Sequence, residues 1–155
     1  MSSYKPNPCK ATLRDAIEDA YSILYDLHGQ AQEIVDNASE GLSQTQRVQT
    51  FGETADALNG ADSAPDVPDS LAEMPINYVE MAKKSKRRGP SRATQCSNAC
   101  SALDGCISAL DEWLEVHKDD EGDAADLVAE AESLRDEISG MKDTAEGCEF
   151  PGMYG

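Results

Sequence analysis

Apolar residues recur at alternating steps of three and four along two long stretches of the chain, and we call each such set a seam. The first seam consists of Leu13, Ile17, Ala20, Leu24, Leu27, Ala31, Ile34 and Ala38. The second consists of Cys96, Cys100, Leu103, Ile107, Leu110, Leu114 and His117. This spacing places the apolar side chains on one face of an α-helix, which is typical of helices that pack against other helices.

A polar break and a shorter seam follow each long seam. The break "EGLSQTQ" precedes Val48, Phe51, Ala55 and Leu58, and the break "KDDEGD" precedes Leu127, Ala131, Leu134, Ile138 and Met141. Within the first break, Ser43 followed by Gln46 has the form of a helix-capping box. Breaks of this length usually connect antiparallel helices, so the pattern predicts two helical hairpins.

The seven prolines lie outside both hairpins, in an N-terminal arm, a central linker and a C-terminal tail. Because proline disrupts helix interiors, this distribution frames the two helical blocks. The sequence therefore predicts an all-α protein, either a four-helix bundle or a coiled-coil-like pairing of hairpins. Its expected parts are the arm (1–10), the first hairpin (11–62), the proline-containing linker with a basic run (63–90), the second hairpin (91–147) and the tail (148–155). Within the linker, "PINYVEMA" is expected to form a short strand or an extended segment over the bundle.

Composition agrees with helix-on-helix packing and adds two expectations. Only 5% of the 155 residues are aromatic, so alanine, leucine and isoleucine must supply most of the core. Gly29, Gly105 and Gly140 lie off the seams, where each weakens its helix by about 1 kcal/mol relative to alanine. The first ten residues have no apolar core of a signal peptide, and no apolar run approaches the roughly 18 residues of a membrane span. We expect a soluble cytoplasmic protein whose five cysteines are reduced thiols.

Charge is distributed very unevenly in this chain, whose formal net charge is −17. Residues 1–82 carry 14 acidic and 4 basic side chains, and residues 101–155 carry 16 acidic and 3 basic ones. An acidic second hairpin can be a solvated face, or it can bind a basic surface of another protein. The candidate partner-binding residues are Asp111, Glu112, Glu115, Asp119, Asp120, Glu121, Asp123, Asp126, Glu130, Asp136 and Glu137.

Residues 83–100 are the exception, with six basic side chains and no acidic one. This basic patch consists of Lys83, Lys84, Lys86, Arg87, Arg88 and Arg92. Such a run can contact nucleic acid or anionic lipid, or act as a nuclear localisation signal. It has no interleaved aromatic residue for base stacking, and its flanks are strongly acidic, so direct nucleic-acid binding is disfavoured. We expect it to contact an acidic surface of the same protein, or to form a second contact on a partner.

No residue pattern supports catalysis or the binding of a cofactor or metal. Cys96 and Cys100 supply half of a zinc site, but on a seam a thiol packs as a small apolar side chain. The segment "HKDDEGDAADLV" fails as a calcium loop, because His117 and Val128 would occupy its first and last ligand positions. Glu112 and Glu115 match only the first half of the Glu-x-x-Glu and Glu-x-x-Asp pattern of all-α nucleotide pyrophosphohydrolases. A magnesium-dependent enzyme of that kind is a remote alternative.

Two stretches resemble small acidic helical accessory proteins encoded by bacteriophages. They are "IEDAYSILYDLHGQAQEIVDNAS" and "PDVPDSLAEM…KKSKRRGPSRATQCSNACSALDGCISALDEWLE". The resemblance implies inhibition of host defence enzymes, modulation of host nucleic-acid machinery, or a minor virion or assembly role, and it implies location in the host cytoplasm.

The sequence therefore predicts a non-enzymatic module for protein–protein interaction. Its acidic helices are expected to bind and inhibit or modulate a host defence or nucleic-acid-handling protein, and mimicry of nucleic acid is one way in which they can do so. The alternative is a structural, assembly or minor virion component that forms homo-oligomers through its heptad seams. Neither hypothesis involves a membrane.

Overall fold

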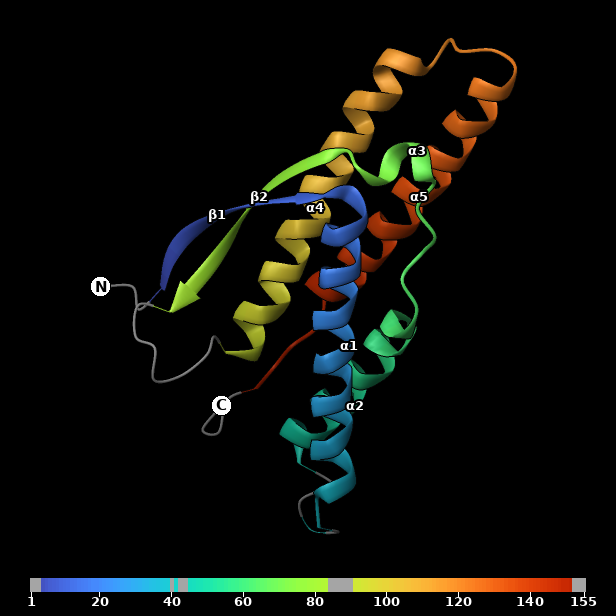
Figure 1. Ribbon diagram of the computed structural model, residues 1–155. Helices are drawn as coiled ribbons and strands as arrows, with labels where there is room; N and C mark the ends of the chain where they lie inside the picture. Colours follow the sequence, from blue (N-terminus) through green and yellow to red (C-terminus); the bar gives the residue numbers. More distant parts are fainter. Residues whose placement is uncertain (1–3, 40, 42–44, 84–90, 152–155) are drawn as a thin grey trace.

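The computed structural model describes residues 4–39, 41, 45–83 and 91–151, which are mostly helical with a small two-stranded sheet (Figure 1). The elements in chain order are β1 (Tyr4–Thr12), α1 (Leu13–Asn37), α2 (Gln46–Leu58), the 3-10 helix η1 (Asn59–Asp62), α3 (Asp69–Ala72), β2 (Pro75–Lys83), α4 (Arg92–His117) and α5 (Asp123–Glu146). The predicted predominance of helix is confirmed, and the sheet is an addition to it. Within the described part of the chain, no helix combines the length and the apolar character needed to cross a membrane.

The core lies where the seams of α1, α4 and α5 meet. The seam residues that are fully buried include Leu13, Ile17, Leu24, Leu27, Leu103, Leu110 and Ile138. α1 packs against both α2 and α4, and α4 packs against α5. Figure 1 shows α4 and α5 side by side, with the ends that are joined by the turn extending beyond α1. The expected bundle is not confirmed, because β2 also packs on α4, where a bundle would place a helix.

Three of the helices begin at a side-chain cap. The caps of α1, α2 and α4 are Thr12, Thr45 and Ser91, whose hydroxyl oxygens accept hydrogen bonds from the backbone N–H three residues later at 3.2, 3.4 and 3.2 Å. These bonds satisfy N–H groups that have no partner within the helix. The capping box predicted at Ser43 is corrected, since Thr45 is the cap and Ser43 lies outside the described residues.

The N-terminal arm and the linker pair with each other as β1 and β2. Their antiparallel register runs from Tyr4 opposite Lys83 to Thr12 opposite Pro75. The strand alternative for "PINYVEMA" is therefore confirmed, whereas pairing with the arm was not foreseen. The sheet connects two segments that are more than sixty residues apart in the sequence, and it lies along α4.

Side chains of α4 hold the backbone of β2. The N–H of Met81 donates to Asn98 Oδ1 at 2.9 Å, and Asn98 Nδ2 donates to the carbonyl oxygen of Met81 at 3.1 Å. One turn further along α4, the hydroxyl of Ser101 donates to the carbonyl oxygen of Val79 at 2.7 Å. Asn98 is buried, and its side chain takes the place of a neighbouring strand for the edge of β2 that faces α4.

Gly105 lies on the same face of α4 and allows the backbone of β2 to approach the helix closely. A Cβ atom at position 105 would lie 2.9 Å from the carbonyl oxygen of Asn77, 3.2 Å from Ile76 Cγ2 and 3.3 Å from Tyr78 Cβ. The expectation that Gly105 only weakens its helix is therefore incomplete. Glycine is required here because β2 crosses α4 at a distance that leaves no room for a side chain.

Candidate functional site

The far end of the α4–α5 pair projects beyond the rest of the fold, and we call residues 111–137 the acidic tip (Figure 1). Seam burial ends at Leu110 on α4 and begins again at Ala131 on α5. The structure describes every residue from 111 to 130, and none of them is buried. Residues 111–130 of the tip therefore form an extension of the two helices whose inward-facing residues are only partly covered, whereas Ala131 and Leu134 at its base are buried.

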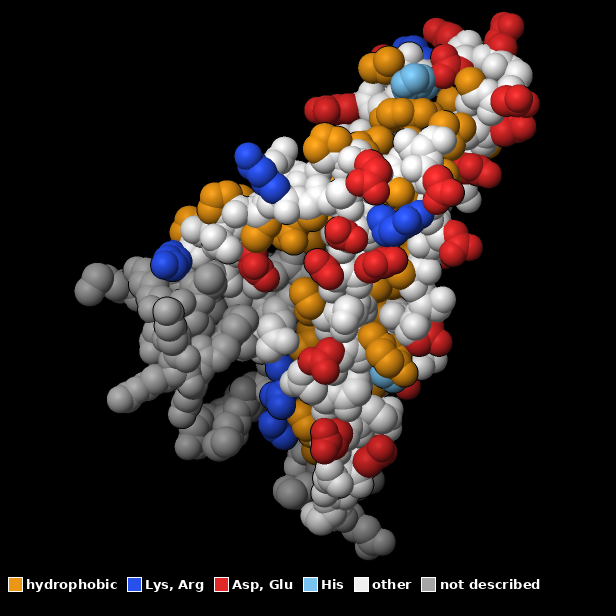
Figure 2. Space-filling view, in the orientation of Figure 1, with side chains coloured by type: hydrophobic (Ala, Val, Ile, Leu, Met, Phe, Trp, Pro, Cys, Tyr) orange, Lys and Arg blue, Asp and Glu red, His pale blue; other side chains and the backbone are white. Residues whose placement is uncertain are grey.

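The tip brings all eleven predicted partner-binding residues together. Ten of them are exposed, and Asp120 is half-buried. Figure 2 shows acidic side chains around the end of the helix pair and along its side. Sequence reasoning missed Glu132, which is also exposed on the tip. Its position off the seam, directly after Ala131, was the signal that could have identified it.

The net charge of the tip is strongly negative even after its internal ion pairs are counted. It holds twelve acidic and two basic residues, a formal charge of −10 with histidine neutral. Lys118 pairs with Glu115 at 2.8 Å, and Arg135 Nε lies 2.9 Å from Asp111 Oδ1 across the two helices. Asp111 raises the pKa of Arg135 through this hydrogen bond and its charge. Both basic groups are thus already paired within the tip.

A shallow apolar groove lies beside the acidic side chains. It has a volume of about 300 Å³ and is lined by Met74, Pro75, Ala109, Glu112, Trp113, Val116 and His117. The ring of Trp113 stacks on His117, with centroids 4.2 Å apart, and His117 Nδ1 lies 2.6 Å from Asp120 Oδ2. These contacts fix the tryptophan and histidine rings on one face of α4, next to the start of β2.

The predicted basic patch lies mostly outside the described residues. Lys84, Lys86, Arg87 and Arg88 are not described, and Lys83 is described only as the backbone end of β2. Arg92 begins α4, where its Nε donates to Gln30 Oε1 at 2.9 Å and its guanidinium lies 5.8 Å from the Phe51 ring centroid. Arg92 therefore fastens α4 to α1 and α2.

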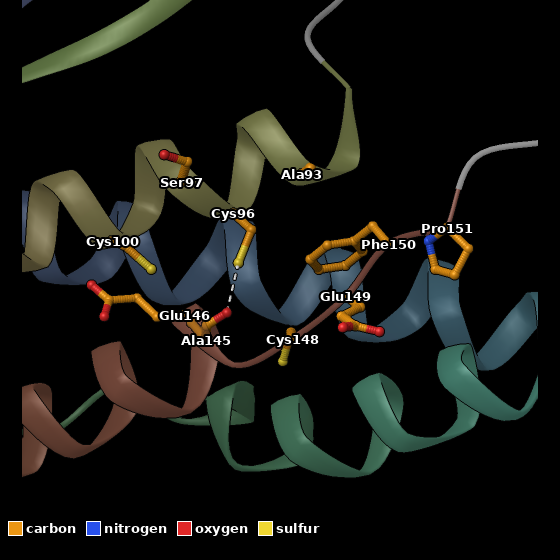
Figure 3. Close-up of a pocket in the computed structure, with 10 residues that line it drawn as sticks. All are labelled: Ala93, Cys96, Ser97, Cys100, Ala145, Glu146, Cys148, Glu149, Phe150 and Pro151. Atoms are coloured by element: carbon orange, nitrogen blue, oxygen red, sulfur yellow. Dashed lines mark hydrogen bonds between the residues drawn. The ribbon is translucent and has the colours of Figure 1, made fainter. Parts of the chain in front are cut away.

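A second cavity lies at the opposite end of the α4–α5 pair and is lined by three thiols (Figure 3). Its volume is about 610 Å³, and its walls come from the start of α4, the end of α5 and the segment after α5. Cys96 and Cys100 are buried as expected for seam positions, and Cys96 Sγ donates to the carbonyl oxygen of Ala145 at 3.3 Å. Cys148 Sγ donates to the carbonyl oxygen of Thr144 at 3.4 Å, and the Phe150 ring lines the cavity.

The thiols of this cavity are arranged as hydrogen-bonded core groups. A hydrogen bond to Cys100, together with burial, raises the pKa of Cys96, and the same hydrogen bond lowers the pKa of Cys100. Burial raises the pKa of Cys148. Among the described residues, no group of three or more histidine, cysteine, aspartate or glutamate side chains is placed to hold a metal ion. Cys148, which lies outside the seam, is brought to the Cys96 and Cys100 pair by the segment after α5.

Comparisons of this chain with protein-family models, with curated proteins and with solved structures found no match.

Proposed function

We propose that the protein is a non-enzymatic interaction module whose acidic tip binds a basic surface of another protein. The observation that carries the proposal is the exposed, projecting tip with its formal charge of −10. In this proposal the second helical hairpin acts as an arm that presents negative charge away from the folded core. Its electrostatic field accelerates encounter with a basic surface and disfavours acidic ones.

The charge density of the tip supports a partner that normally binds nucleic acid. Along α5 the tip runs from Asp123 to Glu137, about 21 Å at 1.5 Å per residue. Over this length, residues 111–117 and 123–137 carry nine acidic and one basic residue, or about one net negative charge per 2.6 Å, which is of the same order as the value of about one per 1.7 Å of duplex DNA. A protein groove built for a phosphate backbone would therefore encounter a similar linear charge. Within this proposal, the role is that of a phage-type accessory protein that inhibits or modulates a host defence or nucleic-acid-handling protein.

Capture of partners from a bacterial lysate, at low and at high salt, tests the proposal. The test variant neutralises five exposed tip residues that form no ion pair within the described structure and lie outside the first turn of α5. Its substitutions are Glu112→Gln, Asp119→Asn, Glu121→Gln, Glu130→Gln and Glu137→Gln. A matched control neutralises five exposed acids of α1 and α2. Its substitutions are Glu18→Gln, Asp19→Asn, Glu33→Gln, Glu53→Gln and Asp56→Asn.

The proposal expects a basic protein that is retained at low salt, is released at high salt and is lost only with the tip variant. Counterion screening shortens the range of charge interactions, which gives the salt dependence. If no basic or nucleic-acid-handling protein is recovered at low salt, the proposal is refuted. Equal loss of the partner with the control variant would show that net charge, and not the tip, controls binding.

The homo-oligomer alternative is less well supported by the packing. The seams that would pair copies of the chain are occupied within one copy, where Leu24, Leu103 and Ile138 are fully buried. Light scattering decides between the two functions: a monomer agrees with the interaction module, and a defined symmetric oligomer favours the assembly role.

A further inference from the structure

The apolar groove on the tip gives the proposed interaction a specific centre. One side of the groove is a face of α4, formed by Ala109, Trp113 and Val116 at spacings of four and three, and Met74 and Pro75 form the other side. Val116 is 77% exposed, the highest value among the large apolar side chains of the described residues that are exposed. A solvated isoleucine or valine is common on protein surfaces. An exposed valine beside a half-buried tryptophan, in a groove formed by two segments distant in the sequence, is less common.

The chemistry around the groove specifies what can fill it. Glu112 is part of the lining, none of the described residues that line it is a lysine or arginine, and the tip around it carries the charge of −10. Acidic segments are repelled by this surface, and an uncharged apolar segment gains nothing from the surrounding charge. A segment that combines a large apolar side chain with flanking arginine or lysine residues is complementary both to the apolar groove and to the acidic side chains around it.

We propose that this groove receives an apolar side chain of a basic protein segment, while the arginine or lysine residues on either side contact the acidic tip. This inference rests on the proposed function and adds the point of contact and the chemistry of the partner. Apolar contacts at the centre of an interface, surrounded by polar ones, commonly carry most of the binding energy, and tryptophan is enriched among them. The charges then set the rate and selectivity of association, and the groove sets how long the complex lasts.

Two synthetic peptides of equal charge test the inference. Each has arginines on both sides of a central pair, which is Leu-Leu in one peptide and Ser-Ser in the other. Binding of the labelled peptides is measured by fluorescence anisotropy, and the fluorescence of Trp113, the single tryptophan of the chain, reports contact at the groove. The protein variants are Val116→Ser and, as a matched control, Val79→Ser, an exposed valine of β2 outside the groove. Neither substitution removes a core side chain.

The Leu-Leu peptide should bind at least about tenfold more tightly than the Ser-Ser peptide, and this ratio should persist at high salt. Val116→Ser should abolish the ratio, and Val79→Ser should leave it unchanged. If both peptides bind with equal affinity and both lose binding to the five-residue tip variant, the groove is not the binding site for an apolar side chain. The proposed function would still stand. Binding of neither peptide at low salt would overturn both. A dimer of the free protein that Val116→Ser dissociates would show that a second copy occupies the groove, which also overturns the inference.

Discussion

Replacing Gly105 by alanine should destabilise the protein, although alanine is the better helix former. In an unobstructed helix the substitution stabilises by up to about 1 kcal/mol, because glycine loses more backbone entropy on folding. At position 105 the new Cβ would lie 2.9 Å from the carbonyl oxygen of Asn77, a backbone atom that cannot rotate away. Two further β2 atoms lie within 3.3 Å of the same point.

The strand has little freedom to withdraw from this contact. Asn98 and Ser101 hold β2 through three hydrogen bonds of 2.7 to 3.1 Å, and β1 pairs with its other edge. Overpacking in such a site costs about 1–3 kcal/mol, and stretching one of these hydrogen bonds adds about 1 kcal/mol. After the propensity gain of about 1 kcal/mol is subtracted, we expect a net destabilisation of about 1–3 kcal/mol.

Gly140→Ala is the matched control, because Gly140 is exposed within α5 and a Cβ atom added there would meet no atom of the described residues within 4 Å. It should stabilise the protein by about 0.5–1 kcal/mol. Both variants are compared with the parent by urea unfolding under reducing conditions, followed by far-ultraviolet circular dichroism. If Gly105→Ala stabilises the protein as much as Gly140→Ala does, the close crossing of β2 over α4 is wrong.

Buried groups and the tip lead to three further predictions. Asn98→Ala leaves the N–H and carbonyl oxygen of Met81 without their side-chain partner, so it should lower the free energy of unfolding by about 2–4 kcal/mol in the same urea assay. An unchanged midpoint would contradict the role of Asn98 in holding β2. Burial, with a smaller effect of Glu137, raises the pKa of Tyr21 to about 12, and burial raises the pKa of Cys106 to about 12. Unfolding above about pH 9 therefore releases protons from these two groups, so their contribution to stability is constant at lower pH and falls toward pH 12 by at most about 1.4 kcal/mol per pH unit for each group. Tyr21→Phe should reduce the loss measured between pH 10 and 12, and an identical pH profile would refute the assignment. Neutralising the five tip residues should raise the urea midpoint more at low salt than at high salt, because it removes like-charge repulsion, and a salt-independent shift would contradict this cause.

The helices were predictable because their signals are local. The three-and-four spacing that starts at Leu13 and at Cys96 identified the helices and their buried faces, since each seam residue is set by neighbours one turn away. The start of α4 after Ser91 was also indicated by the sequence, because Pro90 ends the linker and serine favours the cap position. The cap of α2 was placed two residues early, since Ser43 and Thr45 suit that role equally by type.

The pairing of β1 with β2 was not predictable from the arm alone. Pro6 and Pro8 argued against a strand, because proline cannot donate to a sheet. They are tolerated because their partners in the register, Met81 and Val79, direct backbone groups toward α4. Both prolines therefore lie at positions without hydrogen bonds between the strands, and their nitrogen atoms face the open edge of β1. There they also hinder addition of a further strand.

The order of the residues is enough to specify which of them form helices and how much negative charge the second half of the chain carries, because periodicity and net charge depend on nothing else. Where that charge lies depends on the tertiary fold. The fold left no residue from 111 to 130 buried, and it placed Met74 and Pro75 beside Trp113 to form the groove. These outcomes depend on the pairing of β1 with β2 and on the close contact at Gly105, which join residues far apart in the chain. No local pattern records such contacts, because their energy is gained only when the distant segments meet.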